Sequence, residues 1–548
     1  MFSCMNFTGE CTFCYRNTED EPILYCSCGT EMCSSHSDMH HHPGHAVISV
    51  SVAGSMPDIS IEIEDFGNTV DKDLIISQVR QALLSPKIEG GELQKCEHVS
   101  YEDALAVDTS VCSECEIDSN TWLCTKCNVL FCGREQYGVE GKGHGMKHYS
   151  ENAEHCVFVK VQSIDDVRKT CDAYCYKCDS MVSNGLYGKI KSTLPKKDSP
   201  ALNTLEVSKR MNTKVENLHL GSETALIPYT VVWKTGGMTD LGNTCYISSV
   251  LQSIAYCLRE NMHRLDPVYE TNCEGPKDCF GCQFAKVIRQ IDASHRQKVE
   301  SFSVERLCTI VQSVYPRYVL GTQQDASEYF TDLVELIGNY DEMGHFSDVS
   351  GVFKIKQDML IVCDSCGMSK KQGESAPIVY IGSEQTIDSL FMEEDLPVTC
   401  SCGEKKKKRA NIVEPPAVFS VGIKRGLTEG EGARAPLESR FTVKDFQKKE
   451  RVYRLLAAIV HRGTAHAGHY IAQIPLEECA SDLKGRVYSE YQKCAEASQK
   501  TLSEDEKAGK KKIVSKKNAC VIYDNEKTGV DALFVEDTTV LFYRLCSE

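Results

Sequence analysis

A cysteine at the start of a predicted helix is the residue best suited to chemistry in this sequence. Cys245 follows "DLGNT", and Ile247 and Leu251 continue the chain at helical spacing. A thiol at a helix N-terminus meets the positive end of the helix dipole, which favours the nucleophilic thiolate. Gly242 gives the backbone the freedom that a tight approach turn requires. Cys245 is therefore the predicted nucleophile of a thiol hydrolase.

Such a hydrolase also needs a base that takes the thiol proton and a third group that orients the base. His469 comes just before a predicted strand in "HRGTAHAGHYIAQI", where His461 and His466 are alternatives. Near the C-terminus, "CVIYDNEKTGV" supplies Asp524 and Asn525. The order Cys, His, Asp suits the chemistry. The order alone leaves each of these residues open to a purely structural role.

The elements that would position these side chains change in type along the chain. The stretches 248–258 ("SSVLQSIAYCL") and 326–337 ("ASEYFTDLVELI") have the apolar spacing of helices. The stretches 454–461, 469–474 and 539–545 are typical of strands. Helices come first and the sheet later, so the predicted fold class is α+β.

The length and composition of the chain exclude several classes of protein. A chain of 548 residues is too long for one core, so two or more domains are expected. Its net charge of −17 argues against a general nucleic-acid or membrane-surface binder. The start "MFSCMNFTGEC" lacks a signal-peptide pattern, and runs such as "LLAAIV" are too short to span a membrane. We expect a cytosolic or nuclear protein without nucleic-acid or membrane partners.

In that reducing setting, the 30 cysteines are expected to be metal ligands rather than disulfides. The densest block has twelve ligand-type residues, enough for three tetrahedral zinc ions. They are Cys96, His98, Cys112, Cys115, Cys124, Cys127, Cys132, His144, His148, His155, Cys175 and Cys178. A nucleic-acid finger is the alternative, but this block lacks a basic face.

An earlier block provides four short ligand pairs, which could hold two zinc ions. Interleaved pairing would join Cys11 and Cys14 with Cys33 and His36, and Cys26 and Cys28 with His42 and His45. The spacing is similar to small cross-braced fingers of the AN1 or B-box type. In the alternative interpretation the histidines 40–42 are only surface residues.

A further zinc site is predicted where two short cysteine pairs end neighbouring strands, at Cys363, Cys366, Cys400 and Cys402. In contrast, "CFGC" (279–282) has only Cys273 nearby and is interpreted as structural. All these metals would be structural, and no catalytic metal is expected.

The second Cys/His block resembles the ubiquitin-binding zinc finger of deubiquitinases. The resemblance implies three sites: Cys96/His98/Cys175/Cys178, Cys112/Cys115/Cys132/His144 and Cys124/Cys127/His148/His155. It also implies a narrow pocket for the free Gly-Gly end of ubiquitin, in which an Arg binds the tail between aromatic walls. The pocket residues would be Trp122, Arg134, Tyr137, Tyr174, Tyr176 and Asp179.

The C-terminal half resembles the ubiquitin-specific protease family in "GMTDLGNTCYISSVLQ", "GTQQDASEYF", "HAGHYIAQI" and "VIYDNEKTGV". With the finger before it, the chain is most similar to the isopeptidase T branch. The resemblance implies a papain-like domain of thumb, palm and fingers, with Cys245 as nucleophile, His469 as base and Asp524 as orienting acid. Asn525 would be an auxiliary neighbour. It also implies ubiquitin and polyubiquitin as partners and unanchored polyubiquitin as substrate.

The expected domains follow from these motifs. They are a zinc module (1–52), a connector (53–94), the ubiquitin-binding finger (95–186), a linker (187–234) and the catalytic domain (235–548), with fingers at about 352–425 and an insertion at about 476–517.

Asp240 departs from the family pattern, which has Asn there to donate a hydrogen bond to the oxyanion. An ionised carboxylate would repel that oxyanion, although a protonated one could still donate. The alternative function is therefore a catalytically impaired ubiquitin receptor. A third hypothesis, an enzyme acting on a tethered ubiquitinated substrate, is disfavoured by the Gly-Gly pocket.

Overall fold

The protein is analysed through a computed structural model. The structure describes residues 8–17, 20–26, 28–39, 47–53, 58–64, 95–100, 104–134, 141–166, 168–178, 180–182, 185–193, 230–233, 237–269, 273, 275–296, 301–382, 385–424, 439–444, 447–463, 468–478, 519–524, 527–532 and 538–546. Among these residues, no helix is long and apolar enough to cross a membrane.

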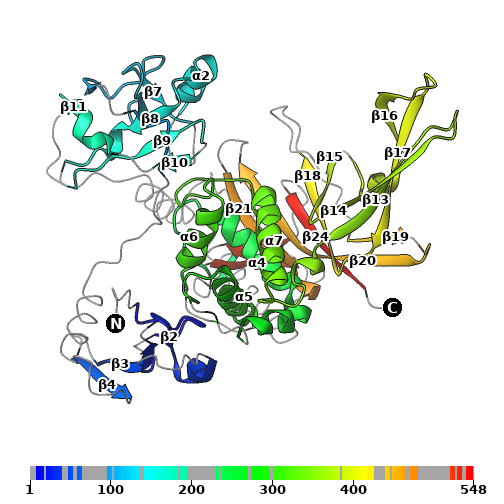
Figure 1. Ribbon diagram of the computed structural model, residues 1–548, viewed down its shortest axis with the longest axis horizontal. Coiled ribbons are helices and arrows are strands. Elements are labelled where there is room, and N and C mark those ends of the chain that lie inside the picture. The colour runs from blue at the N-terminus through cyan, green and yellow to red at the C-terminus, as the bar shows by residue number, and fades with distance from the viewer. Residues whose placement is uncertain are drawn as a thin grey trace, which may run out of the picture.

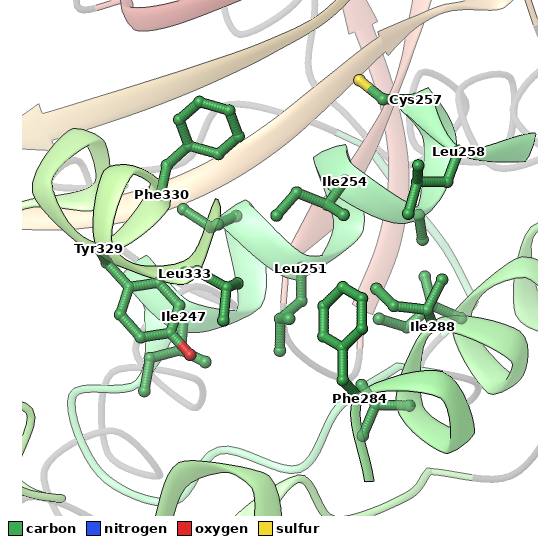
Figure 2. Packing of buried hydrophobic residues seen from close by; sticks show 14 of the residues in the cluster. Ile247, Leu251, Ile254, Cys257, Leu258, Phe284, Ile288, Tyr329, Phe330 and Leu333 are labelled. Carbon is green, nitrogen blue, oxygen red and sulfur yellow. The ribbon is translucent and has the colours of Figure 1, made fainter. Parts of the chain in front are cut away.

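Helices form the thumb, by which we mean residues 237–353. They are α4 (Cys245–Cys257), η4 (Arg259–Tyr269), α5 (Phe280–Arg296), α6 (Glu305–Val314), α7 (Ala326–Glu342) and η5 (Ser350–Val352). Every residue of α4 is buried, because α5 and α7 pack on one side of it and the sheet on the other. Figure 2 shows Leu251 and Ile254 of α4 facing Phe284 and Ile288 of α5. The start of this central helix is therefore held rigidly.

The palm is a nine-stranded sheet beside the thumb (Figure 1). Its strands are β12 (Thr230–Trp233), β15 (Val379–Gly382), β18 (Val418–Lys424), β19 (Arg440–Lys444), β20 (Glu450–Gly463), β21 (Gly468–Pro475), β22 (Ala519–Asp524), β23 (Lys527–Ala532) and β24 (Thr538–Leu545). The order is β12-β23-β22-β21-β20-β24-β18-β15, with β19 on β20, and η7 (Leu476–Glu478) follows β21. The order of helices and sheet confirms the α+β prediction.

The fingers are a separate four-stranded sheet that extends from the palm (Figure 1). They contain β13 (Ile355–Val362), β14 (Ser369–Ala376), η6 (Ile387–Phe391), β16 (Glu394–Thr399) and β17 (Lys405–Glu414). Seven of the eight residues of β14 are exposed, so this sheet has little core of its own. A bound structural metal commonly stabilises the fold of a domain whose hydrophobic core is this small.

The finger, by which we mean residues 95–193, has a five-stranded sheet, β10-β9-β8-β6-β7, and a parallel pair, β5 and β11. Its elements are β5 (Leu105–Val107), β6 (Thr121–Cys124), β7 (Leu130–Cys132), α2 (His144–Glu151), β8 (Val157–Lys160), η2 (Val161–Ser163), β9 (Ala173–Cys175), β10 (Ser180–Val182), η3 (Leu186–Lys189) and β11 (Ile190–Ser192).

The N-terminal module is a small sheet of order β2-β1-β3-β4. Its elements are β1 (Ile23–Cys26), β2 (Glu31–Met32), η1 (Ser34–Met39), β3 (Val47–Ala53) and β4 (Asp58–Glu64). Strand β4 pairs with β3, so the module extends beyond residue 52 into the expected connector.

The expected linker, 187–234, begins and ends in regular structure. Strand β11 pairs with β5 of the finger, and β12 pairs with β23 of the palm. Both strands are short. Strand β11 (Ile-Lys-Ser) has one apolar residue, whereas β12 (Thr-Val-Val-Trp) has the composition of a strand that the linker prediction overlooked. Residues 65–94 of the expected connector and residues 479–517 of the expected insertion lie outside the described residues.

The N-terminal module docks on the thumb through polar groups that it buries. The Tyr15 hydroxyl donates to the Ser303 carbonyl at 3.0 Å, and the Tyr15 and Phe302 rings lie 4.9 Å apart. On α5, Lys286 donates to the Cys11 carbonyl at 3.0 Å. Lys277 forms an ion pair with Glu31, and their side chains are only 12% and 0% exposed. Burial lowers the pKa of Lys277, while Glu31 opposes that shift.

We expect the Lys277→Ala substitution to destabilise the protein by about 3–5 kcal/mol, because it leaves the Glu31 carboxylate buried without its cation. Lys356→Ala is a matched control. Its ion pair with Glu414 is more than half exposed on both sides, so it should cost about 1 kcal/mol or less. Equilibrium urea unfolding of the full chain measures both effects. Equal losses for the two variants would show that the docked interface contributes little.

Candidate active site and zinc clusters

The turn before Cys245 is unusually constrained. Gly242 and Asn243 both have positive φ, 92° and 53°, which is rare for a residue with a side chain. The Asp240 carboxylate stabilises this turn by accepting from the Gly242 N–H at 2.9 Å and the Thr244 hydroxyl at 3.1 Å. Helix α4 then begins at Cys245, whose side chain is buried.

A loop from the other side of the thumb connects this turn with the strand that carries His469. The Asn243 side chain donates to the Gly321 carbonyl at 2.9 Å, and the Gly321 N–H donates to the Gly242 carbonyl at 3.1 Å. Two residues later, the Gln323 amide donates to the Gly468 carbonyl at 2.5 Å. Residues 321–323 thus touch the residues just before Cys245 and just before His469.

The histidine candidates occupy different environments. His469 lies in β21, which packs on α4, and it is half-buried. His461 is buried in β20 with its ring 4.4 Å from the Tyr470 ring, a position that suits a packing role. His466 lies outside the described residues.

Asp524 is the last residue of β22, the strand next to β21. Tyr523 pairs with Ala472, so the same register places the Asp524 backbone beside Ile471, diagonal to His469. The Asp524 side chain and Asn525 lie outside what the structure describes. Asp325 caps the start of α7, where its side chain accepts from the Ser327 and Glu328 N–H groups.

The structure brings together five of the predicted zinc quartets. In each, the four ligand atoms lie within 4.8 Å of one another. The quartets are Cys11/Cys14/Cys33/His36, Cys96/His98/Cys175/Cys178, Cys112/Cys115/Cys132/His144, Cys124/Cys127/His148/His155 and Cys363/Cys366/Cys400/Cys402.

Distances within these quartets suit tetrahedral zinc, whose thiolate ligands stand about 3.8 Å apart at a normal Zn–S bond length. The Cys96 and Cys178 sulfurs are 3.7 Å apart, and the Cys363 and Cys402 sulfurs 3.5 Å. The Cys402 N–H and the Cys366 thiol lower the pKa of Cys400 to about 6, whereas neighbouring thiols raise the pKa of Cys366 and of Cys402.

The sixth predicted zinc set is only partly described. Cys26 ends β1 and is buried, and the Cys28 sulfur lies 3.2 Å from the Thr30 hydroxyl oxygen. Their predicted partners, His42 and His45, lie outside the described residues.

Aromatic side chains of the finger form a continuous wall. Tyr174 lies edge-on to both Trp122 and Tyr176, with ring centroids 6.3 and 5.1 Å away. The exposed Arg134 guanidinium lies 5.8 Å from the centre of the Tyr176 ring. All three aromatic residues are half-buried. Tyr137 and Asp179 lie outside the described residues.

The sequence reasoning missed two residues of this wall. Asn120 accepts from the Trp122 indole at 3.1 Å and donates to the Arg134 carbonyl at 3.2 Å, so it joins the Trp to the Arg. Tyr149 stacks on Tyr176 at 5.4 Å. Gly133 was the one sign in the sequence that side chains crowd together here. A Cβ at this position would come within 2.8 Å of Asn120 and Trp122.

Two known protein families match the parts of the chain that carry these sites. A family model described as "Ubiquitin carboxyl-terminal hydrolase" matches residues 236–523, more than half of the chain. The chain belongs to this family. A second model, "Zn-finger in ubiquitin-hydrolases and other protein", matches residues 112–186. The finger and the Cys/His clusters together support structural zinc.

Individual members of the hydrolase family are distant relatives. Ubiquitin carboxyl-terminal hydrolase 14 of Saccharomyces cerevisiae is 25% identical over 328 residues, which are 55% of this chain and 41% of the relative. Hydrolase 5 of Homo sapiens is 26% identical over 255 residues, 41% of this chain and 29% of the relative. Hydrolase 8 of S. cerevisiae is 21% identical over 466 residues, 73% of this chain and 91% of the relative. The chain thus spans less than half the length of hydrolases 14 and 5.

Asp240 accepts two hydrogen bonds, so the chain uses its carboxylate to stabilise the turn before Cys245. An Asn carbonyl oxygen can accept the same two bonds while its amide faces the oxyanion. We therefore expect Asp240→Asn to raise kcat on a fluorogenic ubiquitin C-terminal amide by up to about 10²-fold, the lower range for one oxyanion donor.

Asp325→Asn is the control, because one Asp325 oxygen likewise accepts from the Ser327 and Glu328 N–H groups, and an Asn carbonyl oxygen can accept the same bonds. It should leave kcat unchanged. A lower kcat for Asp240→Asn, with unchanged stability, would show that the carboxylate is adapted to this site.

Proposed function

We propose that the chain is a cysteine deubiquitinase that hydrolyses the isopeptide bond at the ubiquitin C-terminus. Cys245 is the nucleophile, His469 the base and Asp524 the group that orients His469. The observation that carries the proposal is the hydrogen-bonded loop 321–323, which contacts the turn before Cys245 and the residue before His469. The loop connects two segments that are far apart in the sequence, which supports the proposal because nucleophilic catalysis requires the nucleophile and the base to be held together.

The reaction proceeds in two steps in this arrangement. His469 takes the Cys245 proton, the thiolate attacks the C-terminal glycine carbonyl of ubiquitin, and His469 gives that proton to the departing lysine amine. Water, deprotonated by His469, then attacks the thioester and releases ubiquitin with a free carboxylate. The Cys245 N–H lies in the first turn of α4, where backbone amides have no intrahelical acceptor, so it can donate to the oxyanion.

The substrate that we propose is unanchored polyubiquitin. Trp122, Tyr174 and Tyr176 form an aromatic wall beside the Arg134 guanidinium. An extended Gly-Gly tail can lie against such a wall, and Arg binds the terminal carboxylate strongly. Only a chain with a free C-terminal end presents that carboxylate to the finger.

A catalytically impaired ubiquitin receptor is the second candidate. The position of Asp240 favours it, because a carboxylate lies in the turn where an oxyanion donor would assist the reaction. The finger would then bind chain ends without cleavage.

Cleavage of ubiquitin chains with a free or a blocked C-terminus distinguishes these two functions. We expect the protein to cleave diubiquitin with a free C-terminus at least tenfold faster than diubiquitin whose proximal C-terminus is fused to another protein. Arg134→Ala should remove most of this preference, because the tail loses its charged partner.

Arg168→Ala is the matched control, since Arg168 is a half-exposed finger arginine that interacts with Asp165 instead. It should keep the preference. Equal cleavage of both substrates by the wild type would exclude the unanchored-chain proposal. Binding of both without cleavage would favour the receptor.

A further inference from the structure

Three cysteines meet at the N-terminus of α5, apart from the five quartets described above. Interactions with the Cys273 and Cys282 thiols lower the pKa of Cys279, and interactions with the Cys273 and Cys279 thiols raise the pKa of Cys282, so the three side chains lie next to one another. All three are free thiols. Cys279 and Cys282 are 9% and 1% exposed. Simple apolar packing does not require three sulfur atoms to converge on one point.

We propose that Cys273, Cys279 and Cys282 bind a further structural zinc ion in the thumb. Thiolates are soft ligands that select zinc, and Cys-x2-Cys at a helix start is a common zinc-binding spacing. The sequence showed "CFGC" as a pair with one cysteine nearby, which is why it was interpreted as structural. The structure closes the turn at residues 275–278, where the Asp278 N–H donates to the Gly275 carbonyl at 3.0 Å, and so brings Cys273 to the pair.

His345 is the fourth ligand in this proposal. It follows α7, and its Cδ2 lies 3.0 Å from the point that a Cβ on Gly281 would occupy. Its Nδ1 is buried and has no hydrogen-bond partner among the described residues. An imidazole nitrogen left unpaired in a buried position is costly unless a ligand uses it. A small rotation of the ring would complete a Cys₃His set.

Tyr340 supports the same site from the neighbouring turn of α7. Its ring lies 5.1 Å from the His345 ring, and its side chain lies beside Cys279. A neighbouring side chain that orients a histidine ring is a typical support of a metal ligand. Gly281 leaves room for both side chains, since a Cβ there would also come within 2.9 Å of Tyr340.

The proposed zinc would hold the loop that receives the N-terminal module. Lys277 lies between Cys273 and Cys279, and it forms the buried ion pair with Glu31. Arg306 of α6 holds the same loop from the other side, with a 2.9 Å hydrogen bond to Asp278. A metal at the base of the loop would therefore fix Lys277 in position for docking.

Zinc content tests the proposal. We expect full-length Cys279→Ser to contain one zinc equivalent less than the wild type, by elemental analysis of purified folded protein. Cys308→Ser replaces another buried thumb cysteine and should keep the wild-type content. Equal zinc in Cys279→Ser and Cys308→Ser would overturn the proposal.

Wild-type protein provides a second test that needs no folded cysteine variant. Alkylation followed by peptide mass spectrometry should show Cys273, the half-buried member, protected in the zinc-loaded protein and modified after mild chelation. Cys546 is a half-buried control outside the Cys clusters, and its reactivity should not change with chelation. Rapid alkylation of Cys273 without chelation, or a Cys279–Cys282 disulfide in the protein as purified, would exclude the site.

The fourth ligand has its own test. His345→Ala should release this zinc to a chromophoric chelator roughly 10–100-fold faster, on the scale typical for disturbed metal sites. His263→Ala, at an exposed histidine of η4, should release zinc at the wild-type rate. Equal rates for the two variants would overturn the assignment of His345.

Discussion

The short loop 321–323 is the contact on which the candidate active site depends. Its hydrogen bonds reach Gly242 and Asn243 on one side and Gly468 on the other. Cys245 begins a helix and His469 lies in a strand, so neither element alone can set the distance between them. The left-handed turn at 242–243 is strained without its partners, and the loop supplies them. A fixed geometry between nucleophile and base is what lowers a reaction barrier.

Clusters of Cys and His residues stabilise the parts of this chain that have small cores. The fingers sheet is largely exposed, and the N-terminal module consists of short strands. In both, a ligand quartet lies where apolar burial is limited. The N-terminal module also uses its cluster for docking, because the Cys11 carbonyl accepts from Lys286 of the thumb. Metal binding and domain assembly are therefore coupled in this part of the molecule.

The sequence predicted the features that are local in the chain. Ligand pairs at short spacing, the apolar periodicity of α4 and α7, and the strands β20, β21 and β24 were recognisable because each depends on near neighbours. Contacts between distant segments were not predictable in the same way. Nothing local indicates that Glu31 meets Lys277, that Gln323 meets Gly468, or that Asn120 joins Trp122 to Arg134. Strand β11 was missed because its pairing partner, not its composition, makes it a strand, whereas the β-branched and aromatic residues of β12 were a local signal that was overlooked.

The most direct test of the account is covalent labelling of Cys245 by ubiquitin with an electrophile at its C-terminus. The account predicts that the folded wild type gains one ubiquitin, that Cys245→Ala gains none, and that Cys257→Ser, at the buried far end of the same helix, is labelled like the wild type. A folded, zinc-loaded wild type that stays unlabelled would contradict the assignment of Cys245 as a nucleophile acting on the ubiquitin C-terminus.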